Sequence, residues 1–110
     1  MEIRLVSGTV EMLVMEVLST GPSYGYEIGQ TVLERSQSLF ELKEGSLYPA
    51  LHKLEREGVL ESYWTEHDGR RRKYYRLTAN GLKDLERRRA EWQALARGVN
   101  GVLGLSGSAS

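Results

Sequence analysis

The residues around Asp68-Gly69 constrain the fold of this chain more than any other stretch. After Gly58 the periodicity of the side chains changes from 3.6 residues to 2, which is typical of strands. Asp-Gly between two such segments, residues 59–67 and 70–78, predicts a two-residue hairpin turn, and a turn of that length also sets the register. The predicted pairs are Leu60–Leu77, Ser62–Tyr75, Trp64–Lys73 and Glu66–Arg71 on one face, and Glu61–Arg76, Tyr63–Tyr74 and Thr65–Arg72 on the other. In this register apolar side chains meet and opposite charges meet, as cross-strand energetics favour.

Residues 43–58, directly before the hairpin, have the pattern of a helix that is buried on one side. The apolar positions at helical spacing are Leu47, Ala50, Leu51 and Leu54. The opposite face is small, polar and positive, and it consists of Gly45, Pro49, His52 and Arg56, flanked by Ser46 and Lys53. We expect Ser46 to be the N-cap, Pro49 to lie in the first turn and Gly58 to end the helix. Alone, this pattern also fits an ordinary helix with a solvated outer face.

Two further helices are expected before residue 36. The first has possible caps in Ser7-Gly8-Thr9, ends at Gly21-Pro22 and has the apolar stripe Val10, Leu13, Val14, Val17 and Leu18. The second begins after Ser23 as N-cap and has Gly25, Ile28, Gly29 and Val32 on one face. A loop over residues 36–43 should turn Leu39, Phe40 and Leu42 inward. Tyr24 and Tyr26 fit either the edge of the core, which we favour, or contacts with phosphates.

A last helix is expected to begin after Thr78 and to carry more apolar surface than the preceding residues can bury. Counted from Thr78, its seam follows a 4,3,4,3 spacing through Leu82, Leu85, Arg89, Trp92, Ala96, Val99 and Leu103. Each large apolar side chain left in water forfeits roughly 1.5–3 kcal/mol of burial. A second copy of the chain would cover this stripe, so the pattern predicts a two-fold dimer. The Gly/Ser-rich end of the chain is expected to be a flexible tail.

Composition excludes several classes of protein. The chain has 110 residues, of which 40% are apolar and 27% charged, and this describes one globular domain rather than a disordered segment. No apolar run approaches the roughly 18 residues that span a bilayer, and no signal peptide is recognisable, so we expect a cytoplasmic protein without membrane contact. With no cysteine, disulfides, zinc ribbons and thiol nucleophiles are excluded.

Charge is informative only through its distribution. Lys and Arg number 15 and Asp and Glu also number 15, so the net charge is zero and gives no support to nucleic-acid binding. The basic residues are nevertheless concentrated in two runs, Arg70-Arg71-Arg72-Lys73 and Arg87-Arg88-Arg89. The only histidines, His52 and His67, have no nucleophile or metal-ligand spacing around them. We therefore expect no catalytic residue, no metal and no cofactor.

Together these elements predict an α+β protein, mostly α, with a winged helix-turn-helix of three helices and a two-stranded β-wing. We expect residues 1–78 to form a DNA-binding domain, residues 79–103 a C-terminal dimerisation helix and residues 104–110 a flexible tail. In this fold the third helix can enter a DNA major groove. The basic run Arg70–Lys73 would lie at the hairpin tip, against phosphates or in the minor groove. A dimer would place its third helices at half-sites about one helical turn, near 34 Å, apart.

The chain also resembles a known family. The segment from Gly45 to Gly58 reads GSLYPALHKLEREG and resembles the G-x-LYP-x-L-x-x-LE-x-x-G pattern of PadR-like transcriptional regulators. Trp64, RRKYYRLT at residues 71–78 and Gly81 resemble the wing segment of that family, RRKYYxLTxxG. Gly8-Thr9 and GPSYGYEI at residues 21–28 are similar to its first two helices. The resemblance covers roughly residues 5–97, and the short last helix is like that of the compact subgroup.

The resemblance implies a dimeric winged-helix repressor that binds double-stranded DNA at a palindromic operator and is released by an effector. The residues expected to contact DNA are Ser46, Tyr48, Pro49, His52, Lys53 and Arg56 on the recognition helix, Arg70, Arg71, Arg72 and Lys73 on the wing, and Tyr24 and Tyr26 near the backbone. The residues expected at the dimer interface are Leu82, Leu85, Trp92, Ala96, Val99 and Leu103. Trp92 matches a position that lines a ligand cavity between subunits in some relatives, so it is either plain dimer packing or an effector contact.

One rival interpretation is a winged-helix module that binds another protein and not DNA, because a fold alone does not define a function. Such a module should present an exposed apolar patch on its third helix or its wing. Here both are polar or basic, which favours DNA as the partner.

Overall fold

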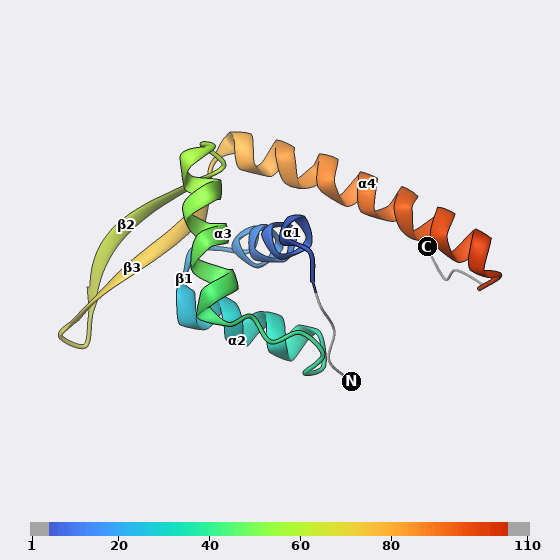
Figure 1. Ribbon diagram of the computed structural model, residues 1–110. Helices are drawn as coiled ribbons and strands as arrows, with labels where there is room; N and C mark the ends of the chain where they lie inside the picture. Colours follow the sequence, from blue (N-terminus) through green and yellow to red (C-terminus); the bar gives the residue numbers. More distant parts are fainter. Residues whose placement is uncertain (1–4, 106–110) are drawn as a thin grey trace.

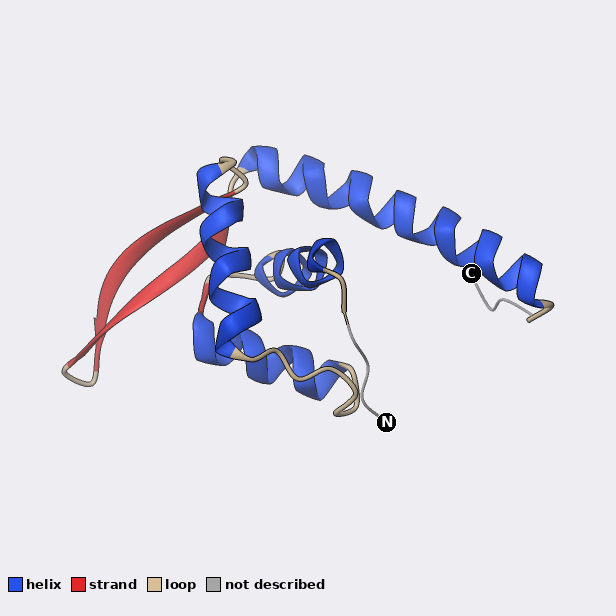
Figure 2. Ribbon diagram, in the orientation of Figure 1, coloured by secondary structure: helices blue, strands red, loops and turns tan. Residues whose placement is uncertain are grey.

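Residues 5–105, which the computed structural model describes, form four helices and a three-stranded antiparallel sheet (Figure 1, Figure 2). In chain order the elements are α1 (Ser7–Leu18), β1 (Ser23–Tyr24), α2 (Gly25–Arg35), α3 (Glu44–Arg56), β2 (Leu60–His67), β3 (Arg70–Leu77) and α4 (Ala79–Leu103). This is the predicted α+β, mostly α, winged helix-turn-helix with a C-terminal helix. Within the same residues no helix is both long and apolar enough to cross a membrane.

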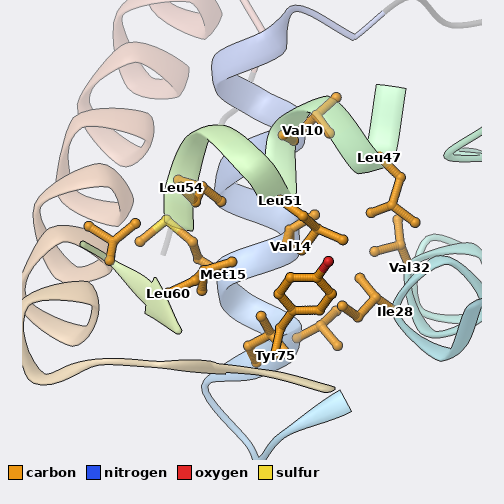
Figure 3. Close-up of a cluster of buried hydrophobic side chains, with 14 of the residues drawn as sticks. Val10, Val14, Met15, Ile28, Val32, Leu47, Leu51, Leu54, Leu60 and Tyr75 are labelled. Atoms are coloured by element: carbon orange, nitrogen blue, oxygen red, sulfur yellow. The ribbon is translucent and has the colours of Figure 1, made fainter. Parts of the chain in front are cut away.

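The core lies between the first three helices and the base of the hairpin, as Figure 3 shows. At its centre, Val14 and Met15 of α1 are fully buried. The surrounding core residues are Ile28 and Val32 of α2, Leu47, Leu51 and Leu54 of α3, Leu60 of β2, Tyr75 of β3 and Leu85 of α4. Burial of each large apolar side chain contributes about 1.5–3 kcal/mol to folding. The core therefore fixes α3 by one face and leaves its opposite face outside.

The hairpin has the predicted register at every pair from Leu60–Leu77 to Glu66–Arg71. Asp68 and Gly69 adopt φ of 53° and 75°, the left-handed conformation that a two-residue turn between twisted strands requires. The sheet has one strand more than expected, because Ser23 and Tyr24 pair with Tyr75 and Tyr74 of β3. The sheet order is β1-β3-β2, so the hairpin is anchored to the chain between α1 and α2.

The predicted start of the second helix was wrong for the same reason. Ser23 is not the N-cap, because its backbone belongs to β1 and its hydroxyl donates to the carboxylate of Glu27 at 2.5 Å. α2 begins at Gly25 instead, with Tyr24 at the cap position. Gly25 is buried against α3, since a Cβ there would lie 2.5 Å from Oη of Tyr48. The small residue allows the two helices to approach closely.

The start of α3 also differs from the prediction. Lys43 occupies the cap position, so Ser46 lies within the first turn and Pro49 lies inside the helix. A proline there leaves the carbonyl of Gly45 without its helical donor. Gly45 and Pro49 are both exposed, so water can bind this carbonyl. The helix ends as predicted at Gly58, which has φ of 77°, and the N–H of Val59 donates to the carbonyl of Leu54 at 3.1 Å.

Smaller corrections concern the first helix and the loop before α3. α1 has Val6 at its cap position rather than a residue of Ser7-Gly8-Thr9. In the loop, Phe40 and Leu42 pack against the core as expected, whereas Leu39 is 46% exposed. The two residues before Leu39, Gln37 and Ser38, have φ of 55° and 65°, and the chain turns sharply there.

α4 begins as predicted at Thr78, whose Oγ1 accepts a hydrogen bond from the N–H of Gly81 at 3.0 Å. The hydroxyl of Thr78 donates in turn to the carbonyl of Gly58 at 2.7 Å, which joins the end of α3 to the start of α4. From there α4 runs past α1, which it contacts, and its C-terminal part extends beyond the rest of the molecule (Figure 1). Gly104 ends it with φ of 73°; of the tail expected at residues 104–110, positions 106–110 lie outside the described residues.

Candidate nucleic-acid interface

The outer face of α3 is open to solvent. Ser46, Pro49, His52, Lys53 and Arg56 are all exposed, and none of them contributes to the buried cluster. The helix is held by the opposite face, through Leu47, Ala50, Leu51 and Leu54. The structure thus presents five of the six side chains expected on the recognition helix.

The sixth side chain, Tyr48, is half-buried. Its ring lies over Gly25 of α2 and 6.4 Å from the ring of His52. Tyr48 therefore packs between α2 and α3 and does not project freely from the face.

Lys53 has a partner within the protein that the sequence did not reveal. Its Nζ lies 3.1 Å from the carboxylate of Glu11, and Glu11 is only 3% exposed. The other carboxylate oxygen of Glu11 accepts from Arg88 of α4 at 3.1 Å. Glu11 thus joins α1, α3 and α4, and it holds the ammonium of Lys53 at the α1 side of the exposed face.

The wing lies beside α3. Figure 1 shows the hairpin projecting from the body next to this helix, and the two elements are in contact at their shared end. There the hydroxyl of Ser62 in β2 donates to the carboxylate of Glu55 in α3 at 2.5 Å. Next to this contact, burial raises the pKa of Tyr75, and the charge of Glu55 and the neighbouring Tyr48 raise it further. The base of the wing is therefore fixed to α3 through polar and aromatic side chains.

The basic residues of the wing do not share one face. Side chains alternate along a strand, so Arg71 and Lys73 lie on the face of Tyr75, and Arg70 and Arg72 on the other. The guanidinium of Arg71 lies 4.8 Å from the centroid of the Trp64 ring, and Nζ of Lys73 lies 5.6 Å from that of Tyr75. On the opposite face Arg72 lies 4.5 Å from the centroid of Tyr24.

These cations pack on aromatic rings and have no carboxylate partner among residues 5–105. The expected attraction between Glu66 and Arg71 does not become an ion pair there, although Glu61 and Arg76 do form one at 2.6 Å. Trp64 is 57% exposed, and sequence reasoning missed it as a surface residue of the wing. The predicted register could have indicated this exposure, because it pairs Trp64 with the charged Lys73.

The two tyrosines near the start of α2 differ in position. Tyr24 is half-buried, with its ring centroid 5.4 Å from that of Tyr74. It lies at the edge of the folded core, as favoured. Tyr26 is 68% exposed in the first turn of α2, so the core-edge interpretation was wrong for this residue.

The second basic run lies in a different environment. Arg87 forms ion pairs with Asp84 at 2.5 Å and with Glu91 at 2.7 Å. Arg88 forms ion pairs with Asp84 at 2.8 Å and with Glu11 of α1. Arg89 forms an ion pair with Glu16 of α1. Partial desolvation acts to raise the pKa of Asp84, but hydrogen bonds from Arg87 and Arg88 outweigh it and hold that pKa below its ordinary value. These three arginines are neutralised by the protein itself.

α4 carries the apolar residues expected at a dimer interface, with one exception. Leu82, Trp92, Val99 and Leu103 are about half or more exposed, and Ala96 is half-buried. Leu85 is 2% exposed within a single chain and belongs to the core, so its assignment to an interface was wrong. The 4,3,4,3 spacing could not distinguish a residue of the core from a residue of an interface, because both lie on the same apolar stripe of the helix. Leu95 and Val102, which were not predicted, extend the exposed apolar surface.

Comparison with known proteins identifies the family. The model of the transcriptional regulator PadR-like family matches residues 14–87. The transcriptional regulator Rv3488 of Mycobacterium tuberculosis (strain ATCC 25618 / H37Rv) is 41% identical over 68 residues, which cover 62% of this chain and 64% of that protein.

Solved structures agree with this relationship. A transcriptional regulator from Clostridium thermocellum is 35% identical with a TM-score of 0.80, and the match covers 86% of this chain and 92% of that one. A PadR family transcription regulator from Clostridium difficile R20291 is 37% identical with a TM-score of 0.76, over 87% of this chain and 99% of that one. The family model spans α2, α3 and both strands of the wing. The chain belongs to the PadR-like family of transcriptional regulators, which bind DNA and are not enzymes.

Proposed function

We propose that the chain is a cytoplasmic repressor that binds a palindromic operator as a homodimer, with α3 in the major groove and the wing against the adjacent backbone. The observation that carries this proposal is the position of the wing cations. Arg71, Arg72 and Lys73 rest on the rings of Trp64, Tyr24 and Tyr75 and have no carboxylate partner in the described part of the chain. Phosphate oxygens of DNA are anionic acceptors that guanidinium and ammonium groups bind.

On α3, the side chains that we propose as base contacts are His52, Arg56 and Ser46. They are exposed in successive turns on the face opposite the buried leucines. Pro49 lies on the same face and offers an apolar contact to a thymine methyl group. Lys53 would reach DNA by leaving Glu11 or by lying between Glu11 and a phosphate. Tyr26, exposed in the first turn of α2, is proposed as a contact to the DNA backbone through its hydroxyl group.

The homodimer is supported by α4. Trp92, Leu95, Val99 and Leu103 are exposed in a single chain, and their burial against a second copy would contribute about 1.5–3 kcal/mol for each fully buried side chain. We propose that residues 1–78 form the DNA-binding unit and that residues 79–103 form the dimerisation helix. Trp92 also lines a groove with Met12 and Leu95, which makes it the candidate contact for an effector between the subunits.

The interpretation as a protein-binding module finds less support. Among the described residues, Trp64 is the large exposed hydrophobic side chain of α3 and the wing, and Arg71 lies over its ring. A surface of this kind lacks the contiguous apolar patch that protein partners bury.

Selection of bound sequences from random duplex DNA tests the proposal. We expect an inverted repeat whose half-sites are centred about 34 Å, one helical turn, apart. Enrichment of no sequence, or of a single unrepeated site, would contradict the palindromic operator.

The dimer has its own test. Trp92→Arg should yield monomers in sedimentation equilibrium, because it places a charge in the proposed interface. Lys83→Arg, on the exposed surface near the start of α4, is the matched control and should remain dimeric. A Trp92→Arg protein that dimerises as tightly as the wild type would place the interface elsewhere.

A further inference from the structure

The wing carries an aromatic side chain to which the proposed contacts give no role. Trp64 is 57% exposed in β2, opposite Lys73 in the register. Because side chains alternate along a strand, Trp64 lies on the same sheet face as Ser62 and Tyr75. At the base of the wing, Ser62 donates to Glu55 of α3, and Tyr75 lies close to the same carboxylate. Trp64 therefore lies further along the face that leads from α3 toward the hairpin tip.

Arg71 makes Trp64 part of a composite surface. Its guanidinium lies 4.8 Å from the centroid of the indole ring, and it makes no hydrogen bond or ion pair with another residue among positions 5–105. A guanidinium stacked on a ring by its flat face keeps its N–H donors directed outward in its own plane. The indole thus restricts Arg71 to orientations in which a bidentate acceptor can approach it.

The chemistry of this pair fits one partner in particular. A DNA strand presents apolar deoxyribose rings beside anionic phosphates at regular intervals. A flat apolar ring next to an outward-facing guanidinium is complementary to that alternation. Lys73 adds a second positive charge on the same face. Exposed surface of this kind is positive as well as apolar, which favours a duplex backbone over an uncharged protein patch.

We propose that Trp64 and Arg71 act as one contact to the sugar-phosphate backbone of duplex DNA, with the indole packed on a deoxyribose and the guanidinium on the adjacent phosphate. The inference rests on the proposed function, because it requires the wing to touch DNA. It adds that Trp64 is itself a contact residue and that it positions Arg71. Both groups touch only backbone, so their contribution is independent of base sequence.

A double-mutant cycle on duplex binding tests the coupling. Trp64→Ala should weaken binding to specific and random duplexes alike, by about tenfold. Trp64→Phe retains a ring and should recover most of this loss. The double variant Trp64→Ala/Arg71→Ala should bind about as weakly as the weaker single variant, because the two groups act as a unit.

Arg72 supplies the matched control. It lies on the opposite face, 4.5 Å from the centroid of Tyr24 and away from the indole. The losses of Trp64→Ala and Arg72→Ala should therefore multiply in the double variant. Multiplicative losses for Trp64 with Arg71 as well would overturn the proposed unit. Thermal unfolding of each variant checks that it is folded.

A spectroscopic test reports the contact directly. The chain contains two tryptophans, so 5-fluorotryptophan labelling gives two fluorine NMR resonances, and the spectrum of Trp64→Phe assigns them. Addition of a 20-base-pair duplex should shift the resonance of Trp64 more than that of Trp92. If a dye-labelled duplex binds but the resonance of Trp64 does not move, the inference fails while the proposed function stands. If no duplex binds the wild-type protein, both fail.

Discussion

The wing and the first half of α4 each carry a run of basic side chains, and the groups around the two runs differ. In the wing, the guanidinium groups of Arg71 and Arg72 lie over the rings of Trp64 and Tyr24. In α4, Arg88 and its two neighbours bind carboxylates of α1 and α4. An aromatic ring positions a cation but leaves its charge uncompensated, whereas a carboxylate neutralises it. Two runs of similar sequence therefore serve different purposes: the first remains available to an anion from outside, and the second holds the helices together.

The largest effect that this comparison predicts is on stability. Glu11→Ala should lower the free energy of unfolding by about 1.5–3 kcal/mol, because it removes charge-assisted hydrogen bonds from a buried carboxylate to Lys53 and Arg88. The shift of the urea denaturation midpoint, with the slope m of the transition unchanged, measures this loss of stability. Glu66→Ala in the wing, whose carboxylate binds no cation in the described part of the chain, is the control and should change stability by about 0.5 kcal/mol or less. Equal losses for the two variants would remove the distinction between the two regions.

The next effect separates base contacts from backbone contacts. His52→Ala on the exposed face of α3 should change the order of preference among operator variants, at roughly 1–3 kcal/mol for each hydrogen-bonded base that it no longer reads. Lys53→Ala should change that order less, because Glu11 already binds its ammonium. Competition binding with a panel of single-base operator variants distinguishes the two. A preference that shifts with Lys53→Ala but not with His52→Ala would contradict this assignment.

A smaller effect concerns pH. Desolvation opposes ionisation of Asp84, but hydrogen bonds from Arg87 and Arg88 lower its pKa below the ordinary value of 3.8. A carboxylate with a lowered pKa in the folded state stabilises the protein above its unfolded-state pKa, and this contribution is lost as the pH falls through the folded value. The wild type should therefore exceed Asp84→Asn in stability at pH 7, and the difference should shrink below about pH 4. A difference that stays constant from pH 7 to pH 3 would show that these ion pairs do not stabilise the fold.

The hairpin could be predicted residue by residue because its determinants are local. A two-residue turn at Asp68-Gly69 leaves one register that places Leu60 and Tyr75 inward. β1 could not be predicted in the same way, since two residues show no period and their pairing depends on β3, about fifty positions away. The start of α3 was misplaced because the helix begins before Ser46, with Lys43 at a cap position that makes no side-chain hydrogen bond, so the capping preference of Ser46 was not a reliable signal.

The residue types of the candidate site could be predicted from the sequence, but the contacts that these residues make within the protein could not. Helical spacing indicated the exposed face of α3, and the basic run indicated the wing. The contacts that distinguish the two basic runs join residues far apart in the chain, such as Arg88 with Glu11. Leu85 shows the same limit, because an apolar position on an amphipathic helix gives no sign of whether its own chain or a second copy covers it.

The salt dependence of duplex affinity tests the central claim most directly, in wild type, Arg72→Ala and Arg87→Ala. Arg72→Ala should reduce the slope of log affinity against log salt by about 0.9 for each phosphate that the variant no longer neutralises, once in each subunit of the proposed dimer. Arg87→Ala should leave the slope unchanged, because Asp84 and Glu91 already neutralise this side chain. Equal slopes for wild type and Arg72→Ala, or a reduced slope for Arg87→Ala alone, would contradict the assignment of the wing to the DNA.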